Sequence, residues 1–225
     1  MILRFQKKNL IMKNINWSDH ILNFLAVILG VLLAFQAESL AEQNKEKQEL
    51  EEILQSFIQD IESDQETFND FQIPNNEKQS AAIADLLTVI LDNQADSLED
   101  QLSLAFNVQN YSPITSTYLS VISSGKFGLI KDFKLKKAIS NYYDVLAQES
   151  IKSGEAQLDF FFKEIIPWMI KNTNMLDLEF EDIAKDVEFA NRLTIYRSLI
   201  HNKTQQYKRI SKDSKELKKA LMDLL

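Results

Sequence analysis

The chain has 225 residues and a formal net charge of −8, and it contains no cysteine. This length suffices for one ordinary domain with a sizeable core, whereas the lack of cysteine excludes disulfide frameworks, thiolate metal sites and cysteine-linked lipid anchors. The acidic balance argues against a nucleic-acid partner, and the scarcity of Gly and Pro predicts an all-α fold with long helices.

An uncharged apolar run occupies residues 21–37. As a helix it would extend about 25 Å, near the lower limit for crossing the hydrocarbon core of a bilayer. Trp17 precedes it where an indole ring favours the interface, and Glu38 and Glu42 follow with charges that lipid disfavours. We therefore predict a transmembrane helix at residues 21–37. The alternatives are a buried core helix and a cleaved signal peptide, although no Ala-x-Ala site occurs there.

The residues on either side of this run predict its orientation. Residues 1–20 form a basic tail, and the positive-inside rule places such a tail in the cytoplasm. Residues 38–225 would then form an extracytoplasmic domain, which is periplasmic if the membrane is a bacterial inner membrane. A start at Met12 would leave only one of the basic residues in the tail. Those residues are Arg4, Lys7, Lys8 and Lys13.

Small residues recur every fourth position within the run, at Ala26, Gly30 and Ala34. Such a track lets a second membrane helix approach closely, so it predicts transmembrane packing and possible homo-oligomers. The alternative is an unselective lipid-facing helix, because Gly and Ala are common in membrane helices.

A stalk helix is expected to continue directly from the run, because no Gly or Pro occurs between Val31 and Ile73. Pro74 and the following Asn pair predict a break, and a second helix to about Leu91. Further helices are expected from caps at Asp96–Ser97 and Ser112–Pro113, the latter ending at Gly125. The apolar stripe predicted for the stalk is Leu50, Leu54, Phe57, Ile61, Asp64, Phe68 and Phe71.

Two more helices are predicted in the C-terminal half. Asp132 can cap one that continues past Gly154 to about Phe162, and Pro167 should end or kink it. The last helix carries a seam with alternating steps of three and four, which is typical of a coiled coil or helical bundle. The seam consists of Leu193, Tyr196, Ile200, Lys203, Tyr207, Ile210, Ser214, Leu217, Leu221 and Leu224.

Charge is unevenly distributed between these helices. Residues 38–100 contain 17 acidic and 3 basic residues, whereas residues 193–225 contain 8 basic and 3 acidic residues. This complementarity predicts that the last helix lies antiparallel to the stalk in a helical bundle. The alternative is that the basic helix serves an outside acidic partner or membrane phosphate groups.

Few residue patterns indicate chemistry. His20 and His201 are too far apart in the sequence to predict a metal site, and no phosphate-binding loop or nucleophile elbow is present. Asp60 and Asp64 lie one helical turn apart and could act as an acid–base pair if buried, although an acidic helix face is the commoner explanation. We therefore predict no enzymatic activity, no metal and no cofactor.

A speculative ligand site follows from a hydroxyl-rich stretch, residues 111–125. Its hydroxyls fall on neighbouring helical turns and could line a pocket, or could instead serve as caps and as small residues for close packing. The predicted ligand-binding residues are Thr117, Ser120, Tyr142, Tyr143 and Trp168.

The order of these features resembles an uncharacterised family of single-span membrane proteins common in Bacteroidota. The resemblance covers Trp17 to Tyr143 and implies topology and fold, without an activity. Relatives often have an Asn-Trp-Asn group after the span, where this chain has residues 37–40. The matching parts are the basic tail, Val27–Gln36, the charged stalk, Thr117–Leu119, Ser124–Gly125 and Tyr142–Tyr143.

Together these patterns predict a membrane-anchored protein-interaction module, an accessory or scaffold subunit of an inner-membrane complex. Its partners would be the lipid bilayer and other membrane or periplasmic proteins. The alternative is a single-pass sensor that binds a small ligand in its bundle.

Overall fold

A computed structural model of the chain describes residues 17–92, 99–174, 183 and 185–225. The described residues are helical apart from short connections and include no strand, which confirms the all-α prediction. They divide into two compact units, one up to Glu49 and one from Leu50 to Leu225. The predicted cap Asp96–Ser97 and the basic residues Arg4, Lys7, Lys8 and Lys13 lie outside the described residues.

The first unit consists of the first part of helix α1, Trp17–Glu66. Its most apolar 18-residue window has a mean hydropathy of 2.0, and none of that window is buried. The large apolar side chains from Ile21 to Phe35 are all exposed. One helix of the described residues is therefore long and apolar enough to cross a membrane, and the alternative of a buried core helix is not observed.

The predicted break at Pro74 is wrong, because the chain stays helical from Trp17 to Asp92. A π-helical turn, η1 (Thr67–Gln72), joins α1 to α2 (Ile73–Asp92). A proline ring would clash with the carbonyl four residues earlier, here that of Asp70, which lies within the wider π turn. The π turn thus lets the helix pass the proline.

The same π turn changes which side chains enter the core. It adds a residue to the helical repeat, so Gln72 is buried where Phe71 was predicted, and Phe71 is 56% exposed. Up to Phe68, the second residue of η1, the predicted stripe is buried, except for Leu50, which is half-buried. The buried members of the stripe are Leu54, Phe57, Ile61, Asp64 and Phe68.

A second long helical stretch runs from Phe133 to Asn172, capped at its start by Asp132 as predicted. Pro167 does not end it, since a π turn again comes just before the proline. Its parts are α5 (Phe133–Ser140), the π turn η3 (Asn141–Leu146), α6 (Ala147–Phe160), the π turn η4 (Phe161–Ile165) and α7 (Ile166–Asn172).

Shorter elements connect the two stretches. Helix α3 (Glu99–Ala105) is followed by an irregular segment, residues 107–115, and α4 (Ser116–Ser123) then begins after Thr115. The predicted helix start at Ser112–Pro113 is therefore wrong. Gly125 has a φ of 73° and follows α4 as the predicted left-handed stop, before the 3₁₀ turn η2 (Lys126–Leu129).

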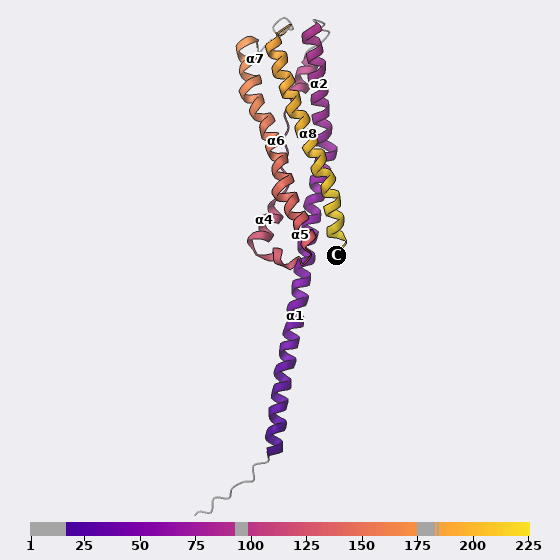
Figure 1. Cartoon of the computed structure of the whole chain (residues 1–225), viewed down its shortest axis with the longest axis vertical. Helices are drawn as coiled ribbons and strands as arrows, with labels where there is room; N and C mark the ends of the chain where they lie inside the picture. Colours follow the sequence, from indigo (N-terminus) through magenta and orange to yellow (C-terminus); the bar gives the residue numbers. More distant parts are fainter. Residues whose placement is uncertain (1–16, 93–98, 175–182, 184) are drawn as a thin grey trace, which may run out of the picture. The chain divides into compact units, whose positions relative to one another are not determined.

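Helix α8 (Val187–Met222) packs along both α2 and α6 in the second unit (Figure 1). Its predicted seam is confirmed from Leu193 to Leu221, whereas Leu224 is exposed. Basic residues of α8 pair with acidic residues of the first long helix, because Lys218 contacts Glu62 at 2.8 Å and Lys208 contacts Glu77 at 2.6 Å.

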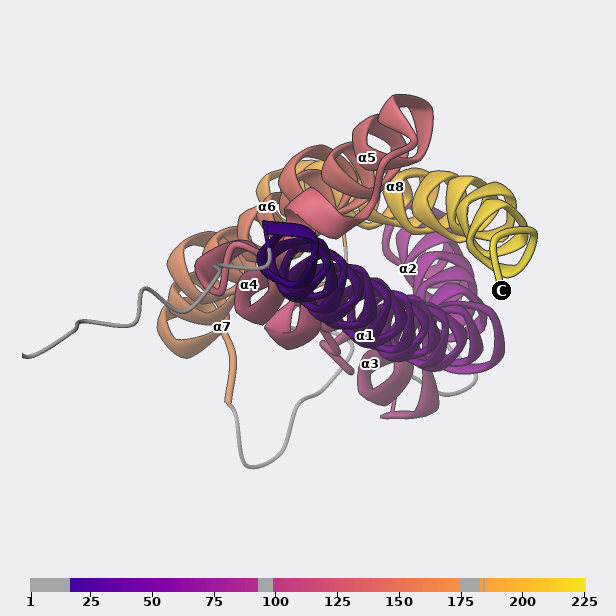
Figure 2. The ribbon, with the colours of Figure 1, turned by 90° about the horizontal axis from the view of Figure 1, so that it is seen from below.

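The core of the second unit consists of two apolar clusters. The first cluster includes Phe57, Tyr142 and Tyr143 together with the C-terminal part of α8. The second cluster includes Trp168 and Phe189 together with the N-terminal part of α8. Figure 2 shows the same helices from below, with α8 between α5 and α2.

Candidate functional site

Several polar side chains of the second unit are buried between its apolar clusters. Burying a polar group costs free energy unless it forms hydrogen bonds, so each of these side chains needs a partner. They come from α1, α2, α6 and α8. The fully or almost fully buried ones include Asp64, Gln79, Gln157 and Lys203.

Asp64 accepts three hydrogen bonds. Its Oδ1 accepts hydrogen bonds from the Tyr111 hydroxyl at 2.6 Å and the Ile114 amide at 3.0 Å, and its Oδ2 accepts one from the Tyr142 hydroxyl at 2.5 Å. Burial raises the pKa of Asp64, and the three hydrogen bonds act in the opposite direction. Burial and the Asp64 charge together raise the pKa of Tyr142, so its hydroxyl stays a donor.

Asp60 and Tyr143 lie beside this network with polar atoms that it does not use. Oδ2 of Asp60 and the hydroxyl of Tyr143 are buried and have no hydrogen-bond partner within the described residues. Burial raises the pKa of Asp60, while a hydrogen bond with the Thr117 side chain lowers it. Burial and the nearby Asp60 charge raise the pKa of Tyr143. An unpaired acceptor and an unpaired donor thus share one interior region.

The segment from residue 105 to residue 114 forms hydrogen bonds with three of the buried polar side chains, those of Asp64, Gln79 and Lys203. Gln79 donates to the Ala105 carbonyl at 2.9 Å, and Lys203 donates to the Gln109 carbonyl at 2.9 Å. Farther along the segment, the Tyr207 hydroxyl accepts from the amide of Tyr111 at 3.3 Å. An irregular backbone has no ladder of its own, so side chains from the helices satisfy it.

Lys203 is buried, and no acidic side chain among the described residues pairs with it. Its Nζ contacts the Gln109 carbonyl and, at 3.3 Å, Oδ1 of Asn110, and it lies 5.8 Å from the centre of the Tyr207 ring. Burial lowers the pKa of Lys203 to about 8. At a pH near this value, half of the molecules would therefore carry a neutral Lys203 amine.

A further set of buried polar side chains, Gln79, Gln157 and Tyr196, joins α2, α6 and α8 by hydrogen bonds. The Gln157 amide donates to the Tyr196 hydroxyl at 3.0 Å and to Oε1 of Gln79 at 3.1 Å, and the Gln79 amide approaches the same hydroxyl at 3.3 Å. Burial raises the pKa of Tyr196 to about 12. This neutral group holds three helices together and contains no acid or base for neutral pH.

The structure brings together only part of the predicted ligand site. Thr117, Tyr142 and Tyr143 gather around Asp60 and Asp64, whereas Ser120 is exposed on α4. Trp168 belongs to the second cluster, where its ring stacks on that of Phe189 with ring centres 4.1 Å apart.

Asp64 is fully buried, in agreement with its place in the predicted stripe, and Asp60 is partly buried. The residues of the predicted transmembrane track are exposed, and a Cβ on Gly30 would meet no atom within 4 Å. Within the described residues, no three His, Cys, Asp or Glu side chains gather closely enough to hold a metal ion.

The sequence patterns place Lys203 in the seam of the last helix without giving it a polar role, and they do not identify Gln79 and Gln157 as interior polar sites. Lys203 carried the clearest signal, because a charged residue interrupts an otherwise mostly apolar seam. The two glutamines gave none, since Gln79 follows the unpredicted π turn η1 and Gln157 follows the unpredicted π turn η3.

An open groove of about 280 Å³ lies beside Tyr142. One wall comes from α5 and η3 and the other from α8, including Asp213 and Glu216. It could admit a small polar molecule from solvent, but its acidic wall disfavours an anion.

Comparisons with known proteins give a family and no activity. No curated protein and no solved structure matches the chain significantly. A family model described as a family of unknown function, DUF6090, matches residues 23–202, from within the apolar run to α8. The chain therefore belongs to the DUF6090 family of unknown function.

Proposed function

We propose that this protein is a single-pass membrane protein that carries a helical interaction module, as an accessory or scaffold subunit of an inner-membrane complex. The observation that carries the proposal is the run from Ile21 to Ala37, whose side chains are exposed on all sides of α1. In water such a surface would be strongly unfavourable, whereas lipid would solvate it.

Protein contact accounts for the second unit better than chemistry does. Its buried polar groups are mostly engaged in holding residues 105–114 and in joining helices. Large apolar side chains also remain exposed on it, among them Phe71 and Phe162. Exposed rings of this size suit contact with another protein.

For topology, we propose a cytoplasmic N-terminus and a periplasmic module. The support is the contrast between the basic residues before the run and Glu38 and Glu42 after it. Ala26, Gly30 and Ala34 offer a face for pairing with another transmembrane helix, including that of a second copy.

The module itself is proposed to be an antiparallel helical bundle. Supporting this, the Ser211 hydroxyl donates to Oδ1 of Asn69 at 2.8 Å, in register with the ion pair of Lys218 and Glu62. Cysteines replacing Asn69 and Ser211 should form a disulfide under mild oxidation. Cysteines at Asn69 and the exposed neighbour Lys212 should not, and equal crosslinking of both pairs would contradict this register.

The interaction role is tested by purifying the tagged full-length chain from its own membranes in mild detergent. We expect a second membrane or periplasmic protein in a fixed ratio, identified by mass spectrometry. The same tag on an unrelated single-span protein serves as the control. A chain that purifies alone, under conditions that preserve known complexes of that membrane, would contradict the proposal.

A ligand sensor is the second candidate, and the groove beside Tyr142 favours it. A small molecule bound there should raise the unfolding temperature of the full-length chain. The gain should be lost in Asn141→Leu, which fills the groove from an exposed position. A ligand whose effect survives that substitution would not bind in this groove.

A further inference from the structure

A basic surface surrounds the start of α5, in contrast to the acidic chain as a whole. Residues 125–137 contain five lysines and one acid, Asp132, within a chain of net charge −8. The Asp132 carboxylate is occupied, because it accepts hydrogen bonds from the amides of Lys134 and Leu135 as the cap of α5. The only carboxylate within residues 125–137 therefore interacts with the first amides of α5.

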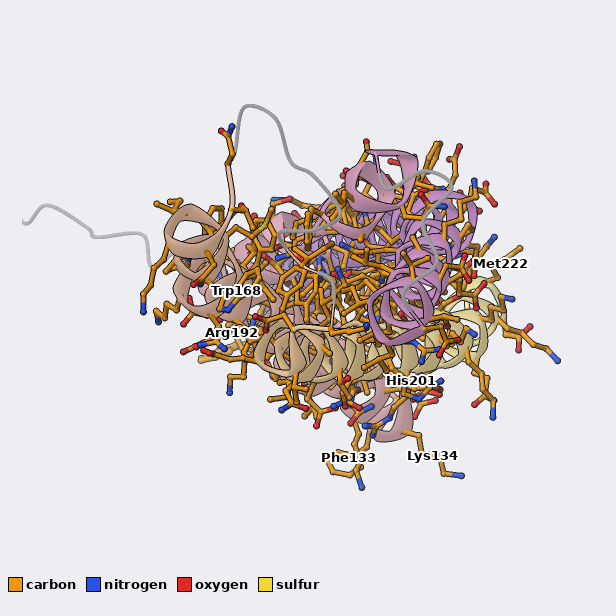
Figure 3. All side chains as sticks on the ribbon, turned by 90° about the horizontal axis from the view of Figure 1, so that it is seen from above. Phe133, Lys134, Trp168, Arg192, His201 and Met222 are labelled. Atoms are coloured by element: carbon orange, nitrogen blue, oxygen red, sulfur yellow. The ribbon has the colours of Figure 1, made fainter. Side chains whose placement is uncertain are left out.

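An exposed aromatic ring stands in the middle of this basic surface. Phe133 is 77% exposed, the highest value among the large apolar side chains of the described residues. Figure 3 shows Phe133 and Lys134 projecting together away from the ribbons. Leu135, two positions on, packs into the first cluster, so the backbone that presents Phe133 is firmly held.

The neighbouring lysines retain charge for an outside partner. Neither Lys134 nor Lys137 takes part in an ion pair with any described residue, and both are exposed. Among the residues that the structure describes, the hydrogen bond of the Lys131 ammonium goes to the carbonyl of Gly128, at 3.2 Å. We call Lys131, Phe133, Lys134 and Lys137 the α5 patch.

We infer that the α5 patch binds the anionic headgroups of membrane phospholipids. Lysine ammonium groups attract the lipid phosphates, and their alkyl stems can lie along the interface. The ring of Phe133 would enter the boundary between headgroups and acyl chains, as an aromatic residue does on an interfacial surface. Basic charge together with an exposed ring is the combination that such binding requires.

Chain connectivity favours lipid over a soluble acidic partner. The α5 patch lies within residues 131–137, next to Ile130 and around Leu135, two members of the first cluster against which Leu50 also packs. Leu50 comes only 13 residues after Ala37, the end of the proposed membrane span. The inference rests on the proposed function, because it requires the anchor to lie in a bilayer.

The absence of native cysteine permits a direct test. The full-length chain with Phe133→Cys is labelled with an environment-sensitive dye and placed in nanodiscs of phosphatidylcholine alone or with phosphatidylglycerol. Phosphatidylglycerol should shift the emission to the blue and protect the dye from iodide quenching. Higher salt should reverse both effects. The dye at Phe162→Cys, an equally apolar exposed position in the second-cluster half, should not respond.

Charge-reversed variants separate the patch from general electrostatics. Lys134→Glu with Lys137→Glu should abolish the response, whereas Lys152→Glu with Lys171→Glu, exposed lysines elsewhere with the same change in net charge, should preserve it. Protein that fails to enter nanodiscs would overturn the proposed function itself. Protein that enters them, but responds equally in both lipids or responds to inorganic phosphate alone, would overturn only the lipid site.

Discussion

The Tyr142 hydroxyl donates a hydrogen bond to Oδ2 of Asp64 across 2.5 Å and so joins the π turn η3 to helix α1. Because Asp64 is fully buried, no solvent can replace this donor. The contact links two helical stretches whose mutual register depends on π turns, which makes it a sensitive point of the second unit.

Replacing Tyr142 by Phe should destabilise the protein by about 1–3 kcal/mol, because Oδ2 of Asp64 would be buried without a donor. The measurement is urea unfolding of the full-length protein in detergent, followed by near-ultraviolet circular dichroism. Tyr118→Phe is the control, since Tyr118 donates to the exposed Asp144 at 2.7 Å and water can take over that bond. Equal losses in both variants would show that burial of Asp64 does not matter.

Lys203 should make stability depend on pH in the alkaline range. Its pKa is lowered from 10.5 to about 8 in the folded protein, so between these values the unfolded chain binds more protons. The free energy of unfolding therefore rises with pH across that window, by an amount on the order of 3 kcal/mol. In Lys203→Met this rise should be absent.

Tyrosines with raised pKa values, such as Tyr142 and Tyr143, oppose the rise at the upper end of the window. They are present in both proteins, so the difference between the wild type and Lys203→Met isolates the lysine. Lys152→Met, at an exposed position, should follow the wild type. Parallel pH profiles for the wild type and Lys203→Met would contradict the assignment.

Gly154 makes room for the side chain of Asn110. A Cβ at residue 154 would lie 3.1 Å from the Asn110 amide atoms, and Asn110 also contacts Lys203. Gly154→Ala should therefore destabilise the protein by about 1 kcal/mol although alanine favours a helix. In an Asn110→Ala background the same substitution should stabilise by about 1 kcal/mol. The same sign in both backgrounds, measured by urea unfolding, would rule out this steric coupling.

The π turn η1 should tolerate a change of side chain but not of length. Asp70 is exposed, so Asp70→Ala should change the free energy of unfolding by no more than about 0.5 kcal/mol. Deleting Asp70 removes one residue of the repeat and rotates α2 by roughly 100° relative to α1. That deletion should lose cooperative unfolding in near-ultraviolet circular dichroism. A deletion variant as stable as Asp70→Ala would mean that the π turn does not set the register.

Helical periodicity predicted most of the fold because it depends on local side-chain patterns. The stripe from Leu54 to Phe68 and the seam from Leu193 to Leu221 are buried as predicted. The π turns were not predicted, because a proline usually ends a helix and no local signal indicates the extra residue that lets it continue. Phe71 was misplaced for this reason.

The candidate site was predictable only in part. Hydroxyl spacing on a short helix predicts Thr117 but does not extend to Tyr142, and the tyrosine donors to Asp64 lie 47 and 78 positions away from it. Tertiary packing alone determines such contacts. Trp168 was grouped with them by residue type, and its distance from them could not be read from helical spacing.

The central claim is that residues 21–37 cross a lipid bilayer, and cysteine scanning of the full-length chain tests it most directly. Single cysteines at Phe24, Leu29 and Phe35 should resist a water-soluble maleimide in intact membranes and react after denaturation in detergent. A cysteine at Glu42 should react without detergent. The account would be contradicted if the chain remained in the supernatant of a detergent-free extract and all four positions reacted at the same rate.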